Sequence, residues 1–431
     1  MTPTLEEQHV TTSRISGFRD LSVDERRDAV AKVAGIDVAE LDAFDAAGFT
    51  VDAAAHMSEN VIGTFSLPVG VAANLTVNGR DVMVPMVTEE ASVIAAASNG
   101  ARMARTLGGF HTTSTGPIMQ AQIQVVDVVD PNAARLRILE AREELMELAA
   151  KQDPKLAEVG GGVKDLIVRI VDSIDETYVV AHLVVDVRDA MGANAVNTMA
   201  EAVADRIAEI ARGRVVLRIL TNKADMRLAR ARAVLDAESL GGEQVVTDMV
   251  HAYRLAAADP YRAATHNKGI MNGISAVVLA TGNDTRAVEA GAHSHAVAPD
   301  GRYTSLSTFE VDADGNIVAT LELPMPVGLV GGATKTHAGA RAAVAVTGVE
   351  SAAELAELIT AVGLAQNIAA LRVLASEGVQ RGHMSLHAKN IAIAVGAGPD
   401  EIGPLVAQLI AEKAFRHDRA EAVLAEIRGA G

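Results

Sequence analysis

The spacing of apolar and polar residues divides the first hundred residues into distinct elements. Ser22, followed three residues later by Glu25, predicts a capping box at the start of a short helix. A pair of strands is predicted over 71–77 and 81–87, and these two runs flank Asn78-Gly79, a dipeptide favoured in type I′ hairpins. The alanine-rich stretch 91–107 follows, opened by two glutamates. Its small residues predict a fully buried central helix.

The pattern changes near residue 115. Strands and helices are predicted in the order β-α-β-β-α-β, at 119–129, 133–151, 167–173, 178–187, 194–211 and 214–220. This order is the signature of a ferredoxin-like, split βαβ unit. The stretch has no GxGxxG motif after a strand, so a Rossmann cofactor site is not supported. We therefore expect an inserted, non-Rossmann domain over 115–221, within a larger domain formed by 1–114 and 222–377.

Beyond residue 222 the alanine-rich helical character returns. A hairpin is predicted from 305–311 and 317–323, and helices are predicted at 352–362 and 366–376. The turn at 312–316 lacks the third acidic position and the terminal glutamate of a calcium loop, so we expect a plain turn. Glycine hinges at Gly378 and Gly382 predict a mobile, helical C-terminal flap over 378–431. The expected fold class is α+β.

Composition and charge exclude several classes of protein. With 431 residues, 49% of them hydrophobic, the chain is long and apolar enough for two or three folded domains. The net charge of −17 argues against sequence-independent nucleic-acid binding and against an anionic membrane surface. The chain has no cysteine, which excludes disulfides and thiolate chemistry. The first residues do not resemble a signal peptide and no apolar run approaches ~20 residues, so we expect a soluble, cytoplasmic protein.

The stretch 264–273 carries the strongest chemical signal. It sets Lys268 between glycines and carboxamides, and Asp284 follows in a second glycine turn. An ammonium near a carboxylate in a mostly uncharged pocket can hold a developing oxyanion and supply a proton, which indicates carbonyl chemistry. In the alternative interpretation, Lys268 is a solvated loop lysine and Asp284 is the N-cap of a helix that begins at Thr285.

His383 and His387 are four residues apart and resemble half of a zinc site. The glutamate of an HExxH motif is absent and no third ligand is apparent, so we expect no metal. A simpler interpretation is one functional histidine beside a glycine hinge, able to transfer a proton near neutral pH. A purely structural histidine is the other alternative.

Three further segments are glycine-punctuated. The stretch 189–194 joins a predicted strand to a helix, where glycine permits close backbone approach and a helix N-terminus favours an anion such as a pyrophosphate. An ordinary strand-to-helix turn needs the same residues. The stretches 59–63 and 323–334 could line a pocket or shape a tight core.

Together these motifs identify a family. The chain resembles 3-hydroxy-3-methylglutaryl-coenzyme A (HMG-CoA) reductase from about Phe18 almost to its C-terminus, through the stretches 59–63, 85–90, 189–194, 281–284, Lys268 and Gly382-His383. The stretch His266-Asn267-Lys268-Gly269 and the lack of a membrane anchor are typical of the class II form of bacteria and some archaea.

The resemblance implies an architecture and a reaction. The large domain, built round a central helix, would bind the CoA thioester, the inserted domain the nicotinamide cofactor, and the flap would close over both. Family members are homodimers, often assembling further, with active sites at the subunit interface. The implied reaction interconverts HMG-CoA with mevalonate plus CoA by two hydride transfers, through mevaldyl-CoA and mevaldehyde.

The resemblance also implies residue roles. Lys268 would stabilise each oxyanion with Asp284 orienting it, His383 would protonate the departing thiolate, and Glu90 matches the catalytic glutamate. The hydroxymethylglutaryl group would be held by Ser92, Arg262 and Asn272, CoA by Glu59, Asn60, Gly63 and Arg19, and the dinucleotide by Asp189, Met191, Gly192 and Asn194. Two competing classes are a zinc hydrolase and a non-catalytic acyl-CoA-binding homologue. The complete catalytic set argues against the second.

The cofactor choice depends on Asp153. A carboxylate beside the adenosine ribose accepts hydrogen bonds from free hydroxyls and repels a 2′-phosphate. The resemblance places an aspartate of NAD-using relatives at Asp153, whereas the nearby Lys151 could serve a 2′-phosphate. Asp153 in a solvated loop is the third interpretation. We expect NADH to be favoured, with NADPH as the alternative.

Overall fold

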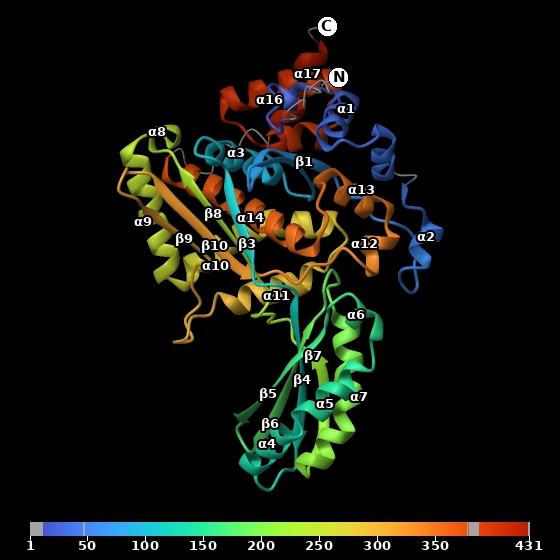
Figure 1. Cartoon of the computed structure of the whole chain (residues 1–431). Helices are drawn as coiled ribbons and strands as arrows, with labels where there is room; N and C mark the ends of the chain where they lie inside the picture. The colour runs from blue at the N-terminus through green and yellow to red at the C-terminus, as the bar shows by residue number, and fades with distance from the viewer. Residues whose placement is uncertain (1–11, 46–47, 377, 379–387, 430–431) are drawn as a thin grey trace, which may run out of the picture.

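The computed structural model describes residues 12–45, 48–376, 378 and 388–429. Two β-sheets organise these residues, and Figure 1 shows the small sheet at the lower end of the molecule and the large sheet above it, each with its own helices. The six-stranded sheet has the order β2-β1-β3-β8-β10-β9. Its strands are β1 (Val69–Val77), β2 (Arg80–Val87), β3 (Phe110–Ser114), β8 (Leu228–Leu235), β9 (Ser307–Val311) and β10 (Ile317–Pro324).

Both predicted hairpins are confirmed in this sheet. The turn between β1 and β2 places Asn78 at φ 49° and Gly79 at φ 78°, the two left-handed residues that a type I′ turn requires. The second hairpin pairs β9 with β10, so the 312–316 segment is the expected turn. The predicted capping box is also present: the Ser22 side chain accepts a hydrogen bond from the Glu25 amide at the start of α1 (Val23–Ala34).

Two strands of the large sheet were not predicted. Strand β8 alternates buried alanines with exposed arginines, so its period is two, but its alanines suggested a helix. Strand β3 has only five residues and carries threonine and serine in place of a strong apolar pattern. Both lie in the centre of the sheet, where hydrogen bonds to the strands on either side hold them.

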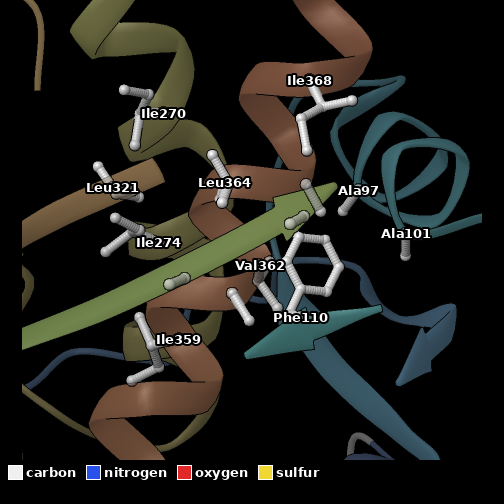
Figure 2. Close-up of a cluster of buried hydrophobic side chains, with 14 of the residues drawn as sticks. Ala97, Ala101, Phe110, Ile270, Ile274, Leu321, Ile359, Val362, Leu364 and Ile368 are labelled. Carbon is white, nitrogen blue, oxygen red and sulfur yellow. The ribbon is translucent and has the colours of Figure 1, made fainter. Parts of the chain in front are cut away.

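The helices packed on the large sheet form the main core. They are α3 (Val93–Arg105), α9 (Glu243–Ala258), α10 (Pro260–Ala280) and α14 (Ala352–Ala375). Figure 2 shows this core where β3, β10, α3, α10 and α14 meet, with the side chains of Phe110, Leu321, Ala97, Ala101, Ile270, Ile274, Val362 and Leu364.

The central helix is α14 rather than the predicted one. Helix α3 exposes Ala95 and Arg102 and buries only one face, whereas α14 is buried along most of its length. Helix α14 is also continuous where two helices were predicted. Gly363, in the predicted gap, is a packing residue, because a Cβ there would lie 2.6 Å from Ile274 Cγ1 on α10. By length and composition alone α14 could cross a membrane, but 72% of its apolar window is buried inside the protein, as in a core helix.

The second sheet has the predicted ferredoxin-like topology. Its order is β5-β6-β4-β7, with β4 (Ile118–Val126), β5 (Gly162–Asp172), β6 (Thr177–Asp186) and β7 (Arg214–Leu220), all antiparallel neighbours. Helix α7 (Ala193–Ala211) covers one face together with α4 (Pro131–Glu140) and α5 (Arg142–Ala150). The single helix predicted at 133–151 is therefore broken at Ala141, and α6 (Pro154–Glu158) follows it.

The remaining elements lie around the large sheet. Helix α1, η2 (Val38–Phe44) and α13 (Ala338–Thr347) pack on the β1–β2 hairpin through Val30, Leu41, Met83 and Val346. The other short elements are η1 (Phe18–Asp20), α2 (Val51–Ala55), α8 (Ala237–Leu240), α11 (Thr285–His295) and α12 (Gly332–Thr336). Near the C-terminus, α16 (Pro399–Glu412) and α17 (His417–Gly429) pack together, at the end of the molecule opposite the small sheet in Figure 1.

Candidate active site

Lys268 lies within helix α10, so the glycine turn predicted around it is wrong. Asp259 caps the helix by accepting hydrogen bonds from the amides of Tyr261 and Arg262, and Pro260 occupies its first turn. Gly273 serves helix packing rather than a turn, because a Cβ there would lie 3.0 Å from Gln366 Cβ on α14. Lys268 projects from the exposed face of this rigid helix.

The first partner of Lys268 is Glu90. Lys268 Nζ lies 3.1 Å from Glu90 Oε2, and the two side chains are 62% and 42% exposed. Glu90 sits in the turn between β2 and α3, and its amide donates to Thr88 Oγ1 at 3.1 Å. The structure thus brings together the acid and the cation that the sequence proposed for catalysis.

The predicted substrate-binding residues lie on α10, which carries Lys268, and at the start of α3, which follows Glu90. Ser92 begins α3 with a left-handed backbone, φ 77°, and its hydroxyl makes no capping hydrogen bond. A non-glycine residue in this conformation costs of order 1–3 kcal/mol and is often found at functional sites. Asn272 is four residues after Lys268 and so lies on the same face of α10. Arg262 is half-buried one turn from the start of α10, and burial lowers its pKa.

Asp284 has partners other than Lys268. Its carboxylate caps α11 by accepting from the amides of Arg286 and Ala287 at 2.9 and 3.2 Å, and it also accepts from Arg286 Nε at 3.0 Å. The Arg286 hydrogen bond lowers the pKa of Asp284. The interpretation of Asp284 as the N-cap of the helix at Thr285 is therefore confirmed. The glycine turn before it is also present, with Gly282 at φ 68° after the end of α10.

A cleft of about 630 Å3 lies between the small sheet's helices and the large sheet's loops. Asp284 lines it, together with four of the five predicted cofactor-binding residues: Asp153, Met191, Gly192 and Asn194. The glycine-rich segment over 323–334 also contributes, through Gly328 and the residues 330–334. Among the described residues, the lining contains the carboxylates of Asp153 and Asp284 and no lysine or arginine.

Helix α7 begins at this cleft. Its N-cap is Gly192, at φ 99°, which makes no side-chain hydrogen bond, so the first amides of a 19-residue helix lack a side-chain cap. Such a terminus favours an anion. Asp189 plays a different part from the one predicted for its neighbours: its Oδ1 accepts from the Ala352 amide at 2.8 Å and so caps the first turn of α14. It is not among the lining residues.

Asp153 is both a cleft residue and a helix cap. Its Oδ1 accepts from the Leu156 amide at 3.0 Å at the start of α6. Asp153 is therefore the N-cap of a short helix rather than a residue of a solvated loop, and one of its carboxylate oxygens is used by that cap. Its position in the lining of the cleft remains compatible with contact to a ligand.

The proposed CoA residues lie outside the cleft. Arg19 is exposed in η1, and Glu59, Asn60 and Gly63 lie in an exposed loop after α2. The same loop exposes two large apolar side chains, Ile62 at 101% and Phe65 at 90%. The described chain therefore does not join its CoA candidates to the cleft. Gly382, His383 and His387 fall outside the described residues.

Asn283 and Gly328 are site residues that sequence reasoning missed. The Gly328 amide donates to Asn283 Oδ1 at 2.8 Å, which ties the turn containing Asp284 to the far side of the cleft. A Cβ at Gly328 would lie 2.4 Å from the Met191 amide nitrogen, so only glycine fits. The glycine-rich segment over 323–334 is a predicted pocket segment, but no local sequence pattern indicates which of its glycines contacts which loop.

Comparisons with known proteins identify the family of this chain. The family model of hydroxymethylglutaryl-coenzyme A reductase matches residues 22–388. The 3-hydroxy-3-methylglutaryl-coenzyme A reductase of Archaeoglobus fulgidus is 53% identical over 417 residues, which are 97% of this chain and 95% of the relative.

Two solved structures from Streptococcus pneumoniae have the same fold. One HMG-CoA reductase superposes with a TM-score of 0.82 and 39% identity, covering 96% of this chain and 99% of its own. A class II reductase bound to NADPH in open conformations superposes with a TM-score of 0.80 and 39% identity, covering 95% of this chain and all of its own, 100%. The chain therefore belongs to the hydroxymethylglutaryl-coenzyme A reductase family, and its structure resembles the class II form.

Proposed function

We propose that this protein interconverts HMG-CoA with mevalonate and CoA by two successive hydride transfers from a nicotinamide cofactor, with NADH favoured. The observation that carries the proposal is the Lys268–Glu90 pair, 3.1 Å apart, in a chain of the HMG-CoA reductase family. Each of the two carbonyl reductions forms an alkoxide-like oxygen that must be stabilised and protonated. A cation and an acid at hydrogen-bond distance from one another can do both.

The chain's own residues divide the work. Lys268 holds the oxygen of the thioester carbonyl, and then of the aldehyde, while negative charge develops on it. Glu90, whose oxygen already contacts the ammonium, hands a proton to that oxygen directly or through Lys268. His383 protonates the CoA thiolate as the hemithioacetal collapses to mevaldehyde. Arg262 pairs with the free carboxylate of the substrate, a geometry for which guanidinium is suited.

The cleft fits a dinucleotide. The uncapped N-terminus of α7 suits a pyrophosphate, and it opens onto the cleft beside Gly192. When bound, a nicotinamide supplies the hydride. The carboxylate of Asp153 in the lining disfavours a 2′-phosphate, and this supports NADH over NADPH. NADPH is the alternative cofactor, and the solved Streptococcus pneumoniae relative bound to NADPH supports it.

The active site is proposed to form between two subunits. Asp284 lines the cleft, whereas Lys268 and Glu90 are not among its lining residues, which supports a site that a second chain completes. Ile62 and Phe65 are almost wholly exposed beside the CoA candidates, as expected of residues that a second copy covers. In this arrangement residues 1–114 and 222–377 bind the CoA thioester, 115–221 bind the cofactor and 378–431 close over them.

The test is an initial-rate assay of nicotinamide oxidation with HMG-CoA, comparing kcat/KM for NADH and NADPH. HMG-CoA-dependent oxidation with a higher kcat/KM for NADH is expected. A higher value for NADPH ends the cofactor assignment and leaves the reaction intact, whereas no oxidation with either cofactor ends the proposed function. Size-exclusion chromatography with light scattering tests the dimer, and a monomeric active enzyme contradicts the shared site.

A further inference from the structure

Arg227 is a buried charge that neither the proposed chemistry nor the family motifs use. It is only 5% exposed and lies just before β8, where the chain returns from the small sheet to the large one. Burial lowers its pKa to about 10, so the guanidinium is still charged at neutral pH. A buried cation is costly unless its donors are satisfied, which makes the identity of its partners informative.

Its two Nη atoms donate to three backbone carbonyls, and the negative charges of Asp189 and Asp186 also favour the charged guanidinium. Nη1 donates to Ala190 O at 3.0 Å and to Met191 O at 3.1 Å, and Nη2 donates to Val327 O at 2.5 Å. The first two carbonyls belong to the loop that leads into α7, and the third belongs to the segment beside Gly328. One planar side chain thus bridges two segments, the loop at 190–192 and the segment at 327–328, which we call the two walls of the cleft.

Further contacts join the two walls beside this bridge. The amides of Leu329 and Val330 donate to Asp189 O at 2.8 and 3.2 Å, and Ala190 forms an isolated parallel bridge with Val330. The Cβ-free Gly328 touches the Met191 amide. The Gly328 amide also donates to Asn283 Oδ1, so the position of the Gly328 segment affects the position of the turn that contains Asp284.

We propose that Arg227 is a positioning residue that sets the cofactor loop at 190–192 against the Gly328 segment and thereby fixes the dinucleotide end of the cleft relative to Asp284. The inference rests on the proposed function, because it takes the cleft to be the nicotinamide site. Lysine cannot replace the guanidinium, since a single ammonium on a different stem does not reproduce the planar fork that spans carbonyls of two segments.

The experiment compares the full-length wild type with Arg227→Lys, and uses Arg232→Lys as a matched control, because Arg232 lies in β8, five residues after Arg227, and is exposed. The dissociation constant of NADH is measured from the fluorescence of the reduced nicotinamide, against a chain that contains no tryptophan. The dissociation constant of CoA and the thermal midpoint are measured on the same samples.

Arg227→Lys is expected to raise the NADH dissociation constant and KM about tenfold or more, the loss of one hydrogen bond from a charged group. CoA binding should change less than about twofold, because its candidate residues lie outside the cleft, and Arg232→Lys should match wild type. An unchanged NADH constant overturns the proposal. So does a parallel loss of NADH binding, CoA binding and thermal stability, which indicates a merely structural role.

A second variant covers the case in which Arg227→Lys does not fold. Gly328→Ala presses the same two walls apart, because its Cβ would lie 2.4 Å from the Met191 nitrogen. It should also raise the NADH constant selectively, and an unchanged constant again overturns the proposal. A wild type that binds no NADH or NADPH refutes the proposed function and this inference with it, whereas wild-type binding that neither variant alters refutes the inference alone.

Discussion

Replacing Lys268 by methionine separates a catalytic role of this residue from a structural one. Methionine keeps an unbranched side chain and a good helix propensity in α10 while removing the ammonium. The pair with Glu90 spans 3.1 Å, but the two side chains are 62% and 42% exposed. Exposed ion pairs contribute about 0–1 kcal/mol to folding, so the thermal midpoint should hardly move.

Turnover should respond on a different scale. The loss of one oxyanion donor typically costs about 10²–10³ in kcat, which corresponds to about 2.7–4 kcal/mol of transition-state stabilisation. Since both reductions form an oxyanion in the same place, Lys268→Met should slow HMG-CoA reduction and the reduction of added mevaldehyde alike. The catalytic loss therefore exceeds the loss of folding free energy by about 2–4 kcal/mol.

The assay is nicotinamide oxidation at saturating substrate, with HMG-CoA binding and thermal unfolding measured in parallel. Lys32→Met is a suitable control, because Lys32 is an exposed lysine in the last turn of α1. A Lys268→Met protein that binds HMG-CoA normally and keeps turnover within about threefold of wild type refutes the oxyanion role. A large stability loss would instead show that the pair with Glu90 is a structural contact.

Three other predictions concern separate parts of the account. His383→Gln should slow thioester reduction far more than reduction of added mevaldehyde, because only the first step releases a thiolate; equal losses contradict the assignment. Asp153→Asn keeps the cap on the Leu156 amide but removes the charge, so it should raise kcat/KM for NADPH relative to NADH without a change in thermal midpoint. An unchanged ratio removes Asp153 as the determinant. Burial first, and then the positive charge of Arg262, lower the pKa of His266 to about 3, below an ordinary value near 6.5. Between pH 3 and 6.5 the folded protein binds fewer protons at His266 than the unfolded chain does. The contribution of His266 to the free energy of unfolding is therefore complete above pH ~6.5 and is lost as the pH falls towards 3, with about 2 kcal/mol lost at pH 5. Urea unfolding of wild type and His266→Gln at pH 7.5 and pH 5 measures this loss. An equal pH dependence of the free energy of unfolding in both proteins excludes His266 as its cause.

The elements that sequence could predict are those fixed by local patterns. The Asn78-Gly79 hairpin follows from the turn's own backbone requirement, and the β-α-β-β-α-β order follows from periodicity alone. Helix α10 could not be predicted this way. Gly273 looks like a turn residue in the sequence, but the glycine is set by the approach of Gln366 from a distant helix.

The same limit applies to the candidate site. Lys268 and Glu90 are 178 positions apart, so no spacing rule joins them, and Asp284 seemed the nearer partner because it is nearer in sequence. Asp153 and the residues at 191–194 were proposed from the family resemblance, and the structure brings them to one cleft. No sequence pattern indicated a role for Arg227, because its hydrogen-bond acceptors are backbone carbonyls, which any residue provides.

The most direct test of the central claim is the ratio of nicotinamide oxidised to CoA thiol released during complete turnover of HMG-CoA. Absorbance reports the nicotinamide, and a thiol reagent reports CoA without background from the enzyme, because the chain has no cysteine. Two hydride transfers with one thiolate departure predict about two nicotinamides per thiol, with mevalonate as the product. A ratio near one would mean that reduction stops at the aldehyde, and thiol release without nicotinamide oxidation would mean hydrolysis; either result contradicts the account.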